Sequence, residues 1–479
     1  MGNMTKSTLE VDGEGVGTIY WMPSDEINVF YGTAGAHYVS QNAENATTAI
    51  FSTTDIIGIS EGAATNIWGL YPYNPSATCT GTAVKTTLPA TQYGVPDTFD
   101  DDLFITLAHN TSTALTFFNV CGGIKFSLSR DDISKITFQG NRGELIAGDI
   151  SLSFVEGHPS ANVSSGQQVI TLLPKTGDTF SSGENYYLVL LPVTLAGGFT
   201  MAFETNTGDV GVFCYDTSSV TISRSKFGKK ANIDSFALFT PPDNQIWYTT
   251  TDGNILSGNS WQNTFSAVSH ECIDGKCILT FENDIENVPE SLFANRDKLV
   301  SVSIPKSVNR IQQTVFANCS SLKFIAIPHH ERTTYFSIAT GTFHHCTSLV
   351  YISLPEVPIN GIYGGVGINN GSLRDCSSLA TIVLPNTLKY IGSSVLKGCT
   401  SLSSPIIIPS SVQQIYYSAF EGCSNLPSIT FLATTPPTGG DDMFKDTNDC
   451  PIYVPAGSLD AYKAASKWSV YADRIQAIP

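Results

Sequence analysis

The sequence predicts a mainly β protein, in which two β-sandwiches are followed by a stack of short repeats and a short helical cap. Three observations support this prediction. Residues 1–240 contain short stretches in which apolar and polar residues alternate, separated by Gly, Asn, Asp and Pro, as in half-buried strands joined by turns. Residues 293–450 repeat one phrase at a nearly constant interval. The last segment contains one stretch of helical character, from Ser458 to about Lys467, with Ser458 as its N-cap.

The two β-sandwiches are expected to divide the first half of the chain about equally. Because one sandwich domain takes roughly 120 residues, we place the first at residues 1–128 and the second at residues 129–240. A linker is expected over residues 241–265, since a Pro-Pro-Asp sequence opens it and such sequences interrupt strands. The repeats then occupy residues 266–450, and the cap occupies residues 451–479.

A phrase of the form F-x-x-C-(S/T)-S-L-x-x-I-x-(I/L)-P defines the repeats. The intervals between successive copies are 23, 27, 30, 23, 24 and 24 residues. A period of about 20–29 residues with Leu and Ile at fixed offsets is the signature of a leucine-rich-repeat solenoid, in which each unit buries its apolar face only against its neighbours. Such a stack exposes a long, ordered surface, which favours binding over catalysis. The copies start at Phe293, Phe316, Phe343, Leu373, Leu396 and Phe420, with a degenerate copy at Phe444.

Five of the eleven cysteines take the same place in successive repeats. A side chain at this place is expected to point into the stack, where a reduced thiol behaves as a small apolar group. Arg296 takes the place in the first unit, as expected at a solvent-exposed end. We therefore predict a column of reduced cysteines inside the stack. Its members are Cys319, Cys346, Cys376, Cys399 and Cys423.

A further pair of cysteines flanks a turn. Cys272 and Cys277 enclose a segment that contains Asp274-Gly275, and Asp-Gly favours a tight hairpin. The two cysteines would then lie opposite each other on neighbouring strands. A disulfide and two reduced thiols packed in the core are both compatible with this arrangement, and we favour the reduced thiols.

The charge and composition exclude several functions. The net charge of −17 argues against binding to nucleic acid, which requires clustered Lys and Arg. No apolar run approaches the roughly 18–20 residues that span a bilayer. The sequence contains no motif of a hydrolase, a zinc protease or a nucleotide-binding site in the context that such a motif needs. We therefore expect no enzymatic activity, no catalytic residue and no cofactor.

The first strand of each repeat is expected to expose alternate side chains, because the pleat of a strand has a period of two. These positions carry no charge. One interpretation is a neutral face, partly covered by neighbouring structure, and the other is a ligand-binding face on which Phe324 and Tyr351 are the strongest candidates. The positions are Ser301, Ser303, Phe324, Ala326, Tyr351, Ser353, Thr381, Val383, Ser428 and Thr430.

Two adjacent repeats carry inserted residues, within residues 329–341 and 356–371. Insertions in a repeat stack lie in loops on one face, which is often the binding face. The second insertion contains Tyr363, Asn369 and Asn370 among several glycines, and these three residues are our main candidates for recognition. Neutral drift of a surface loop explains the insertions equally well.

Four of the eight histidines fall in the same two repeats, and His330 and His344 are candidates for ligand contact. Neighbouring side chains of an extended segment point in opposite directions. The adjacent pairs His329-His330 and His344-His345 are therefore not expected to chelate one ion. Convergence of one histidine from each pair, beside Glu331, stays open. Solvated loop histidines and no metal site are the expectation.

Several phrases in the first half of the chain match one known family. They are Trp21-x3-Asp25-Glu26-Ile27-x2-Phe30, Tyr71-Pro72-Tyr73, Leu115-Thr116-Phe117-Phe118-Asn119-Val120-Cys121-Gly122-Gly123-Ile124 and Tyr186-Tyr187-Leu188-x2-Leu191-Pro192. In these phrases the chain resembles the fimbrillin-like (Mfa-like) proteins of Bacteroides-type bacteria. The resemblance implies two transthyretin-like β-sandwiches. In shaft-forming relatives, an Arg-specific protease removes an N-terminal segment before subunits exchange strands. The first arginine here is Arg130, so shaft formation is not expected.

The repeats match a second family. The phrases Ile304-Pro305-Lys306-Ser307-Val308, Ala419-Phe420-Glu421-Gly422-Cys423 and Tyr453-Val454-Pro455-Ala456-Gly457 resemble the BspA-type leucine-rich repeats of the same bacteria. Together the resemblances imply a cell-surface protein, anchored as an outer-membrane lipoprotein, whose export signal has been removed from this sequence. We expect a non-enzymatic adhesin that binds an extracellular protein or glycan through the repeats. A structural fimbrial component that exchanges strands with other fimbrial subunits, and a surface glycan-binding protein, are the alternatives.

Overall fold

Strands dominate the chain and form two compact units. The computed structural model describes residues 7–11, 17–55, 66–100, 102–215, 218–256, 266–273, 275–329, 335–357 and 365–478. The first unit comprises Met1–Asn206 and Tyr215–Phe236, and the second comprises Thr207–Cys214 and Ala237–Pro479. The mainly β class is confirmed. Among the helices of the described ranges, none combines the length and the apolar character needed to cross a bilayer.

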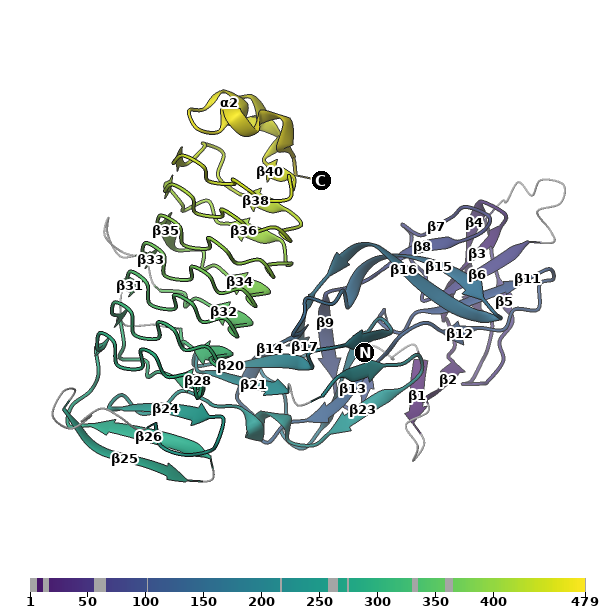
Figure 1. The fold of residues 1–479 in the computed structure, drawn as a ribbon. Coiled ribbons are helices and arrows are strands. Elements are labelled where there is room, and N and C mark those ends of the chain that lie inside the picture. Colours follow the sequence, from purple (N-terminus) through teal and green to yellow (C-terminus); the bar gives the residue numbers. More distant parts are fainter. Residues whose placement is uncertain are drawn as a thin grey trace. The chain divides into compact units, whose positions relative to one another are not determined.

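Short strands build the first unit (Figure 1). They are β1 (Ser7–Val11), β2 (Gly17–Trp21), β3 (Glu26–Tyr31), β4 (Ala34–Ser40), β5 (Phe51–Ser52), β6 (Ile67–Tyr71), β7 (Thr78–Cys79), β8 (Val84–Leu88), β9 (Thr91–Val95), β10 (Thr98–Phe99), β11 (Thr106–Asn110), β12 (Phe118–Asn119), β13 (Gly122–Ser127), β14 (Ile133–Gly140), β15 (Ala147–Val155), β16 (His158–Gln167), β17 (Val169–Pro174), β18 (Asn185–Leu190), β19 (Val193–Leu195), β20 (Phe199–Thr205), β22 (Val220–Ile222) and β23 (Phe227–Lys230), followed by a 3-10 helix over Ile233–Phe236. The three larger sheets contain β12-β11-β6-β3-β4-β5, β10-β9-β17-β14-β20 and β16-β15-β8-β7. The smaller sheets are β18-β13-β23, β19-β22 and β1-β2.

Strands from both sides of residue 128 share sheets in the first unit. β8 pairs with β15, β9 runs parallel to β17, and β13 pairs with β18. The buried side chain of Gln92 also joins β9 to β18, because its Nε2 donates to the carbonyl oxygen of Val189 at 2.7 Å and its Oε1 accepts from the amide of Val189 at 3.1 Å. The boundary that we expected at residue 128 therefore does not separate the sheets, because strands from before and after it pair with each other.

In the second unit the first strands of the repeats pair in parallel, and so do their second strands (Figure 1). The strands are β21 (Val210–Tyr215), β24 (Gln245–Thr250), β25 (Ala267–Ile273), β26 (Lys276–Phe281), β27 (Asn287–Val288), β28 (Leu299–Ser303), β29 (Arg310–Ile311), β30 (Phe324–Ala326), β31 (Tyr335–Ile338), β32 (Tyr351–Ser353), β33 (Gly365–Ile368), β34 (Thr381–Val383), β35 (Leu388–Ile391), β36 (Ile406–Ile408), β37 (Gln414–Ile415), β38 (Ile429–Phe431), β39 (Thr438–Gly439), β40 (Ile452–Val454) and β41 (Ile475–Ala477). The first sheet has the order β25-β26-β24-β28-β30-β32-β34, and the second has the order β27-β29-β31-β33-β35-β37-β39. A further sheet, β36-β38-β40-β41, continues toward the C-terminus.

Stacked rings and thiols fill the interior of the repeats. The ring centroids of Phe293 and Phe316 lie 5.5 Å apart, and those of Phe316 and Phe343 lie 5.2 Å apart, with the planes within 10° of parallel. Each cysteine of the predicted column is buried, and its Sγ donates to a main-chain carbonyl oxygen of the preceding unit at 3.0 to 3.2 Å. Burial raises the pKa of Cys319 and Cys423 to about 12. The prediction of a reduced, buried column is confirmed.

The repeat stack begins before residue 266, because β24 belongs to it. β24 pairs antiparallel with β26 on one side and with β28 on the other. Its alternate residues Ile246 and Tyr248 are completely buried, so the segment that we assigned to a linker contains a core strand. The hairpin of β25 and β26 extends the sheet further, and Arg296 is partly buried, where we expected a solvent-exposed end.

Cys272 and Cys277 form a disulfide in the hairpin of β25 and β26, with their Cα atoms 3.9 Å apart. The preference for two reduced thiols was therefore wrong. Cys277 is buried, whereas Cys272 is partly exposed, so only one of the two positions faces the core. The opposed placement of the two residues agrees with the hairpin that Asp-Gly predicts.

The helical segment after β40 packs on the last repeats (Figure 1). It consists of 3-10 helices over Ala456–Ser458 and Ser469–Arg474 and of α2 (Leu459–Ala464). The indole of Trp468 is buried in this segment, and its Nε1 donates to the carbonyl oxygen of Pro437 at 2.8 Å. The expected helix is present but ends at Ala464, and the Ser458 side chain makes no capping hydrogen bond.

Candidate functional site

The face that we expected to be exposed on the first strands is largely buried. The side chains of Ser301 and Ser303 are almost fully covered, and the Oγ of Ser303 donates to the carbonyl oxygen of Phe239 at 2.8 Å. Phe324 and Tyr351 are neighbours in the register of β30 and β32, but they are only 7% and 6% exposed. The alternation rule correctly placed these side chains outside the repeat core, but it did not predict that they are buried there. They are therefore not available as a binding surface.

Two of the other predicted residues lie outside the described part of the chain. These residues are Tyr363 and His330, which belong to the two insertions. The described ends of the insertions are informative, because Asn369 and Asn370 follow β33 directly. The side-chain Nδ2 of Asn369 donates to the carbonyl oxygen of Ile338 at 2.9 Å, and the Oδ1 of Asn370 accepts from the amide of Ser393 at 2.9 Å. Both asparagines thus tie one repeat to the next.

Each repeat turns sharply after its second strand, with two residues in the left-handed conformation. The first lies two residues before the stacked Phe or Leu, and the second lies two residues after it. Such positions favour Gly, Asn, Asp and His, and these residues fill the second position, whereas Ser and Thr are more frequent than Gly at the first. The first position is occupied by Ser291, Thr314, Gly341, Gly371, Ser394 and Ser418, and the second by Asn295, Asn318, His345, Asp375, Gly398 and Gly422.

These turns surround a small surface pocket of about 270 Å³. His344 and Asn370, which were predicted separately from the sequence, both line it, so two of the predicted residues do converge. Most of the remaining lining is small or polar, with one guanidinium and one phenol ring. The lining residues are Thr340, Gly341, His344, Asn370, Gly371, Arg374, Ser393, Ser394 and Tyr417.

A row of tyrosines lies beside this pocket on the second sheet, and we call it the tyrosine face. It consists of Tyr335, Tyr390, Tyr416 and Tyr417, of which Tyr335 and Tyr417 are 43% and 57% exposed. The rings of Tyr390 and Tyr416 meet edge to face with centroids 6.5 Å apart. The hydroxyl of Tyr390 donates to the Oδ1 of Asn369 at 3.3 Å, and partial burial raises the pKa of this phenol.

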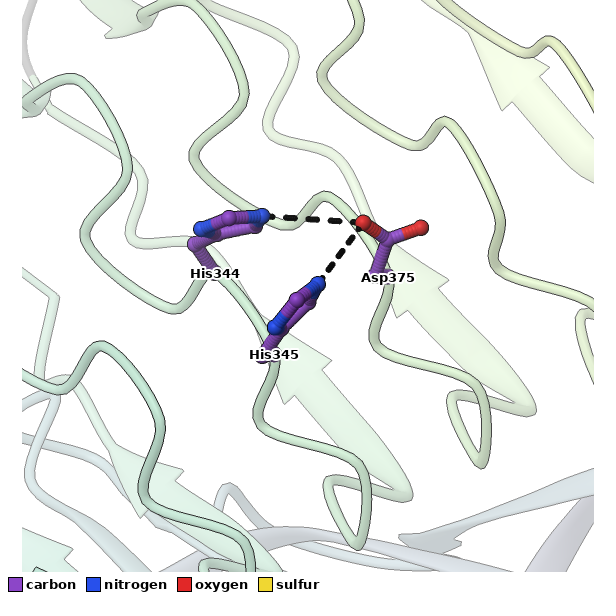
Figure 2. A group of neighbouring side chains, drawn as sticks. All are labelled: His344, His345 and Asp375. Atoms are coloured by element: carbon purple, nitrogen blue, oxygen red, sulfur yellow. Dashed lines mark hydrogen bonds and ion pairs between the residues drawn. The ribbon is translucent and has the colours of Figure 1, made fainter. Parts of the chain in front are cut away.

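His344, His345 and Asp375 form a compact cluster at the turns (Figure 2). The Nε2 of His345 lies 3.0 Å from the Oδ2 of Asp375, and the Nε2 of His344 lies 3.5 Å from the same oxygen. Desolvation and then the neighbouring ring of His345 lower the pKa of His344. We expected adjacent histidines to point apart, and this was wrong. The rule holds for extended segments, whereas His345 has φ of 61° in a turn, and the two rings lie 4.0 Å apart.

The other histidine pair takes no part in this cluster within the described residues. The Nδ1 of His329 accepts a hydrogen bond from the amide of Glu356 at 2.9 Å. Asp375, Arg374 and the tyrosines were not among the residues predicted from the sequence. Alignment of the repeats by their second left-handed position would have placed Asp375 at the position that His345 holds in the preceding repeat. The tyrosines carry no such signal, because they occupy different positions of their repeats.

The repeats of this chain match a known family. The BspA type leucine rich repeat region model matches residues 270–366 and 337–458 in six copies. The second half of the chain therefore contains a BspA-type leucine-rich-repeat region. No functionally curated protein matches the sequence.

Solved structures with some similarity to the chain also contain leucine-rich repeats or come from surface proteins. A leucine rich repeat protein from T. pallidum is 30% identical over 36% of this chain and 72% of its own, with a TM-score of 0.29. A leucine rich cell surface protein from Faecalibacterium prausnitzii is 23% identical over 40% of this chain and 46% of its own, with a TM-score of 0.30. A Bacteroides uniformis protein described as a cell adhesion protein is 12% identical over 49% of this chain and 94% of its own, with a TM-score of 0.30.

Proposed function

We propose that this protein is a non-enzymatic surface adhesin that binds an extracellular macromolecule through the tyrosine face and the adjoining pocket. The observation that carries this proposal is that Tyr416, whose ring meets that of Tyr390, is followed directly in the chain by Tyr417, which lines the pocket. Tyrosine and arginine are enriched at the points of protein interfaces that contribute most to affinity. The surface offers exposed phenol rings beside the guanidinium of Arg374 and the amide of Asn370, which supply directional hydrogen bonds.

The location of the proposed site fits the way in which repeat stacks bind. Successive units present equivalent positions at regular spacing, so a ligand that is longer than one unit contacts several of them. The tyrosine face extends over the second sheet from β31 to the end of β37. A protein or glycan chain of extended shape is the kind of ligand that such a surface suits. The resemblance to BspA-type repeats supports a cell-surface location with a lipid anchor as part of the same proposal.

The test is binding of the chain to arrays of extracellular-matrix proteins and glycans, with surface variants in parallel. Tyr390→Ala combined with Tyr417→Ala removes two phenols of the tyrosine face. Tyr93→Ala in the first unit is a matched control, because Tyr93 is 42% exposed, between the half-buried Tyr390 and Tyr417, which is 57% exposed. We expect the double variant to lose at least about 1–2 kcal/mol of binding free energy, which is the typical loss at such positions, and the control to bind as the parent does.

Equal binding by the parent and the double variant would place the ligand elsewhere and reject this site. Binding of the chain to an arrayed protein would support a protein-binding adhesin, and binding to an arrayed glycan would support a glycan-binding protein. Tyr417→Ala changes an exposed side chain, so it is expected to leave thermal unfolding nearly unchanged. Tyr390 is half-buried and hydrogen-bonded to Asn369, so Tyr390→Ala is expected to lower stability modestly. A large loss of stability in the double variant would require Tyr417→Ala alone to be compared with the control.

Strand exchange in the manner of a fimbrial component is a second candidate, and a hollow in the first unit supports it. The hollow has a volume of about 1110 Å³. Apolar and aromatic side chains of the β3 and β6 region line one part of it, and Thr, Asn, His and Arg side chains line the rest. The indole of Trp21 lies at its side, with the rings of Phe51, Tyr71 and Phe117 all within 5.0 to 5.2 Å. An extended apolar segment from another subunit is the kind of occupant that such a hollow suits.

Sedimentation over a range of concentrations tests this second candidate. Ala114 lines the hollow and is exposed, so Ala114→Arg is expected to obstruct the entry without disturbing the core. Self-association that Ala114→Arg abolishes would support strand exchange. A monomer at all concentrations, together with ligand binding by the repeats, would leave the adhesin as the sole candidate.

A further inference from the structure

The second left-handed position of the repeats forms a column of side chains along the edge of the stack. Residues at this position in successive units lie one above the other, as the hydrogen bond from Nδ2 of Asn318 to Oδ1 of Asn295 at 2.9 Å demonstrates. His345 and Asp375 are the next two members of the column, and their contact has the same origin. The column therefore brings His345 and Asp375, which lie 30 residues apart in the chain, to hydrogen-bonding distance.

His344 adds a third group to the contact between His345 and Asp375. Its Nε2 points toward the same carboxylate (Figure 2) and lies 3.5 Å from Oδ2. This distance exceeds the usual range of about 2.7–3.2 Å for a hydrogen bond to oxygen. The Nε2 atom is buried, and it has no hydrogen-bond partner among the described residues. A buried nitrogen without a partner, aimed at a carboxylate, indicates that the arrangement suits an additional group between them.

We propose that His344, His345 and Asp375 form a binding site for a divalent transition-metal ion of the Zn²⁺ type. The three ligand atoms lie within 4.8 Å of one another. With metal–ligand bonds of about 2.0–2.2 Å, two ligand atoms of a tetrahedral zinc site lie about 3.3–3.5 Å apart. The distances of 3.0 and 3.5 Å between the imidazole nitrogens and Oδ2 already lie close to this value. Small rotations of the two rings bring the set to bonding distance.

The chemistry of the three groups selects the class of ion. Two imidazoles and one carboxylate suit Zn²⁺, Ni²⁺, Cu²⁺ and Fe²⁺, whereas Ca²⁺ and Mg²⁺ prefer oxygen ligands only. Three protein ligands leave a fourth coordination position for water or for a group of a bound partner. His344 also lines the surface pocket, so a bound ion would stand beside the proposed binding surface.

Arg374 is the one described cation that competes directly for the carboxylate. Its Nε lies 3.2 Å from the Oδ2 of Asp375. The side chain of Arg374 is 46% exposed, so it swings into solvent with little loss of packing when an ion binds. The cysteines do not compete, because the repeat thiols are buried and Cys272 and Cys277 are joined in a disulfide.

Isothermal titration of the chelator-treated, tag-free chain with ZnCl₂ tests the site. We expect one Zn²⁺ per chain. His345→Asn and Asp375→Asn are suitable variants because Asn tolerates the left-handed conformation at both positions. Each is expected to weaken binding more than about tenfold, since loss of an outer-shell partner alone costs about 10–100-fold. Co²⁺ in place of Zn²⁺ is expected to give the intense visible bands of a tetrahedral site, which both variants lose.

His37→Asn is the matched control. The Nε2 of His37 lies 3.4 Å from the Oε2 of Glu26, and the side chain of His37 is about as exposed as that of His344. This ion pair contains one histidine, whereas the proposed metal site contains two. This variant is expected to bind Zn²⁺ as the parent does. Absence of stoichiometric Zn²⁺ binding at about 100 µM metal, or equal loss in the control and the two column variants, would overturn the proposal. Unchanged thermal unfolding of the variants without metal excludes misfolding as the cause of a loss.

Discussion

Gly367 lies directly against the phenol of Tyr390 in the next strand of the second sheet. A Cβ atom added to Gly367 would stand 2.5 Å from the hydroxyl oxygen and 2.8 Å from the ring carbon that bears it. We predict that Gly367→Ala displaces Tyr390 and weakens binding to the tyrosine face about as much as Tyr390→Ala does. The stability cost is expected to lie near the lower end of about 1–3 kcal/mol, because the obstacle is the far end of a side chain and not backbone. Binding and thermal unfolding of the same sample check both statements.

Gly457→Ala is the control for this prediction, because a Cβ at Gly457 meets nothing within 4 Å. It is expected to change neither binding nor unfolding. Full ligand binding by Gly367→Ala would mean that Tyr390 does not contact the ligand.

The phenylalanine stack predicts a graded loss of stability. Phe316 is fully buried between the rings of Phe293 and Phe343, so Phe316→Ala is expected to lower the free energy of unfolding by about 3–5 kcal/mol. Phe316→Leu is expected to cost clearly less, since Leu373 and Leu396 hold the same position in other units. Urea denaturation of the two variants measures the difference. Val470→Ala, at a position 76% exposed, should stay within about 0.5 kcal/mol of the parent. A similar loss of stability in all three variants would contradict the stabilising role of the stacked rings.

The cysteines predict a definite labelling pattern. Eight of the nine free thiols are buried, and Cys214 is partly exposed. The native chain is therefore expected to incorporate at most one alkylating group. After unfolding without reductant it should incorporate nine groups, and after reduction eleven, because one disulfide joins the remaining two cysteines. Intact-mass measurement counts the groups. Eleven groups without reductant would show that Cys272 and Cys277 are not bonded.

We predict that the folded protein loses stability in mild acid because of His270. Burial lowers the pKa of this histidine, and its ring is hydrogen-bonded to the hydroxyl of Tyr248. The folded state therefore binds fewer protons than the unfolded state near and below the unfolded pKa of about 6.5. Stability is present above that value and is lost as the pH falls toward the folded pKa. His270→Gln removes this term, so its Tm should fall less between about pH 7.5 and 5 than that of the parent. An identical fall in both proteins would contradict the prediction.

The repeats were predictable because their pattern is local. Each unit packs only on its neighbours, so the period, the cysteine column and its burial follow from the sequence of one unit and its copies. The first unit of the fold was less predictable. Its sheets join β8 to β15 and β9 to β17. The local sequence of a strand does not predict which distant strand pairs with it. The core strand β24 was missed for a similar reason, since its partners lie on both sides of it in the sheet and not next to it in sequence.

The candidate site was predicted in part. Asn370 and His344, two of the residues predicted from the inserted repeats, share a pocket, and their role in binding stays a prediction. Tyr351 and Phe324 were misjudged because alternation gives the side of a strand on which a residue lies, and not what covers that side. The expectation for His344 and His345 was wrong because it assumed an extended backbone, whereas the left-handed conformation of His345 turns both rings to one side.

The thiol column keeps one spacing in units of unequal length. Its hydrogen bonds to the preceding unit span 26, 30, 33, 26 and 27 residues of chain, yet their lengths differ by only 0.2 Å. Residues added to a unit are thus excluded from the interior and accumulate at the rim. Duplication or deletion of a whole unit in the gene would change the length of the repeat stack without creating a new kind of core. Insertion of residues into a single unit would change only the surface loops at the edge of the stack. Lineages of such proteins can therefore vary reach and rim chemistry independently.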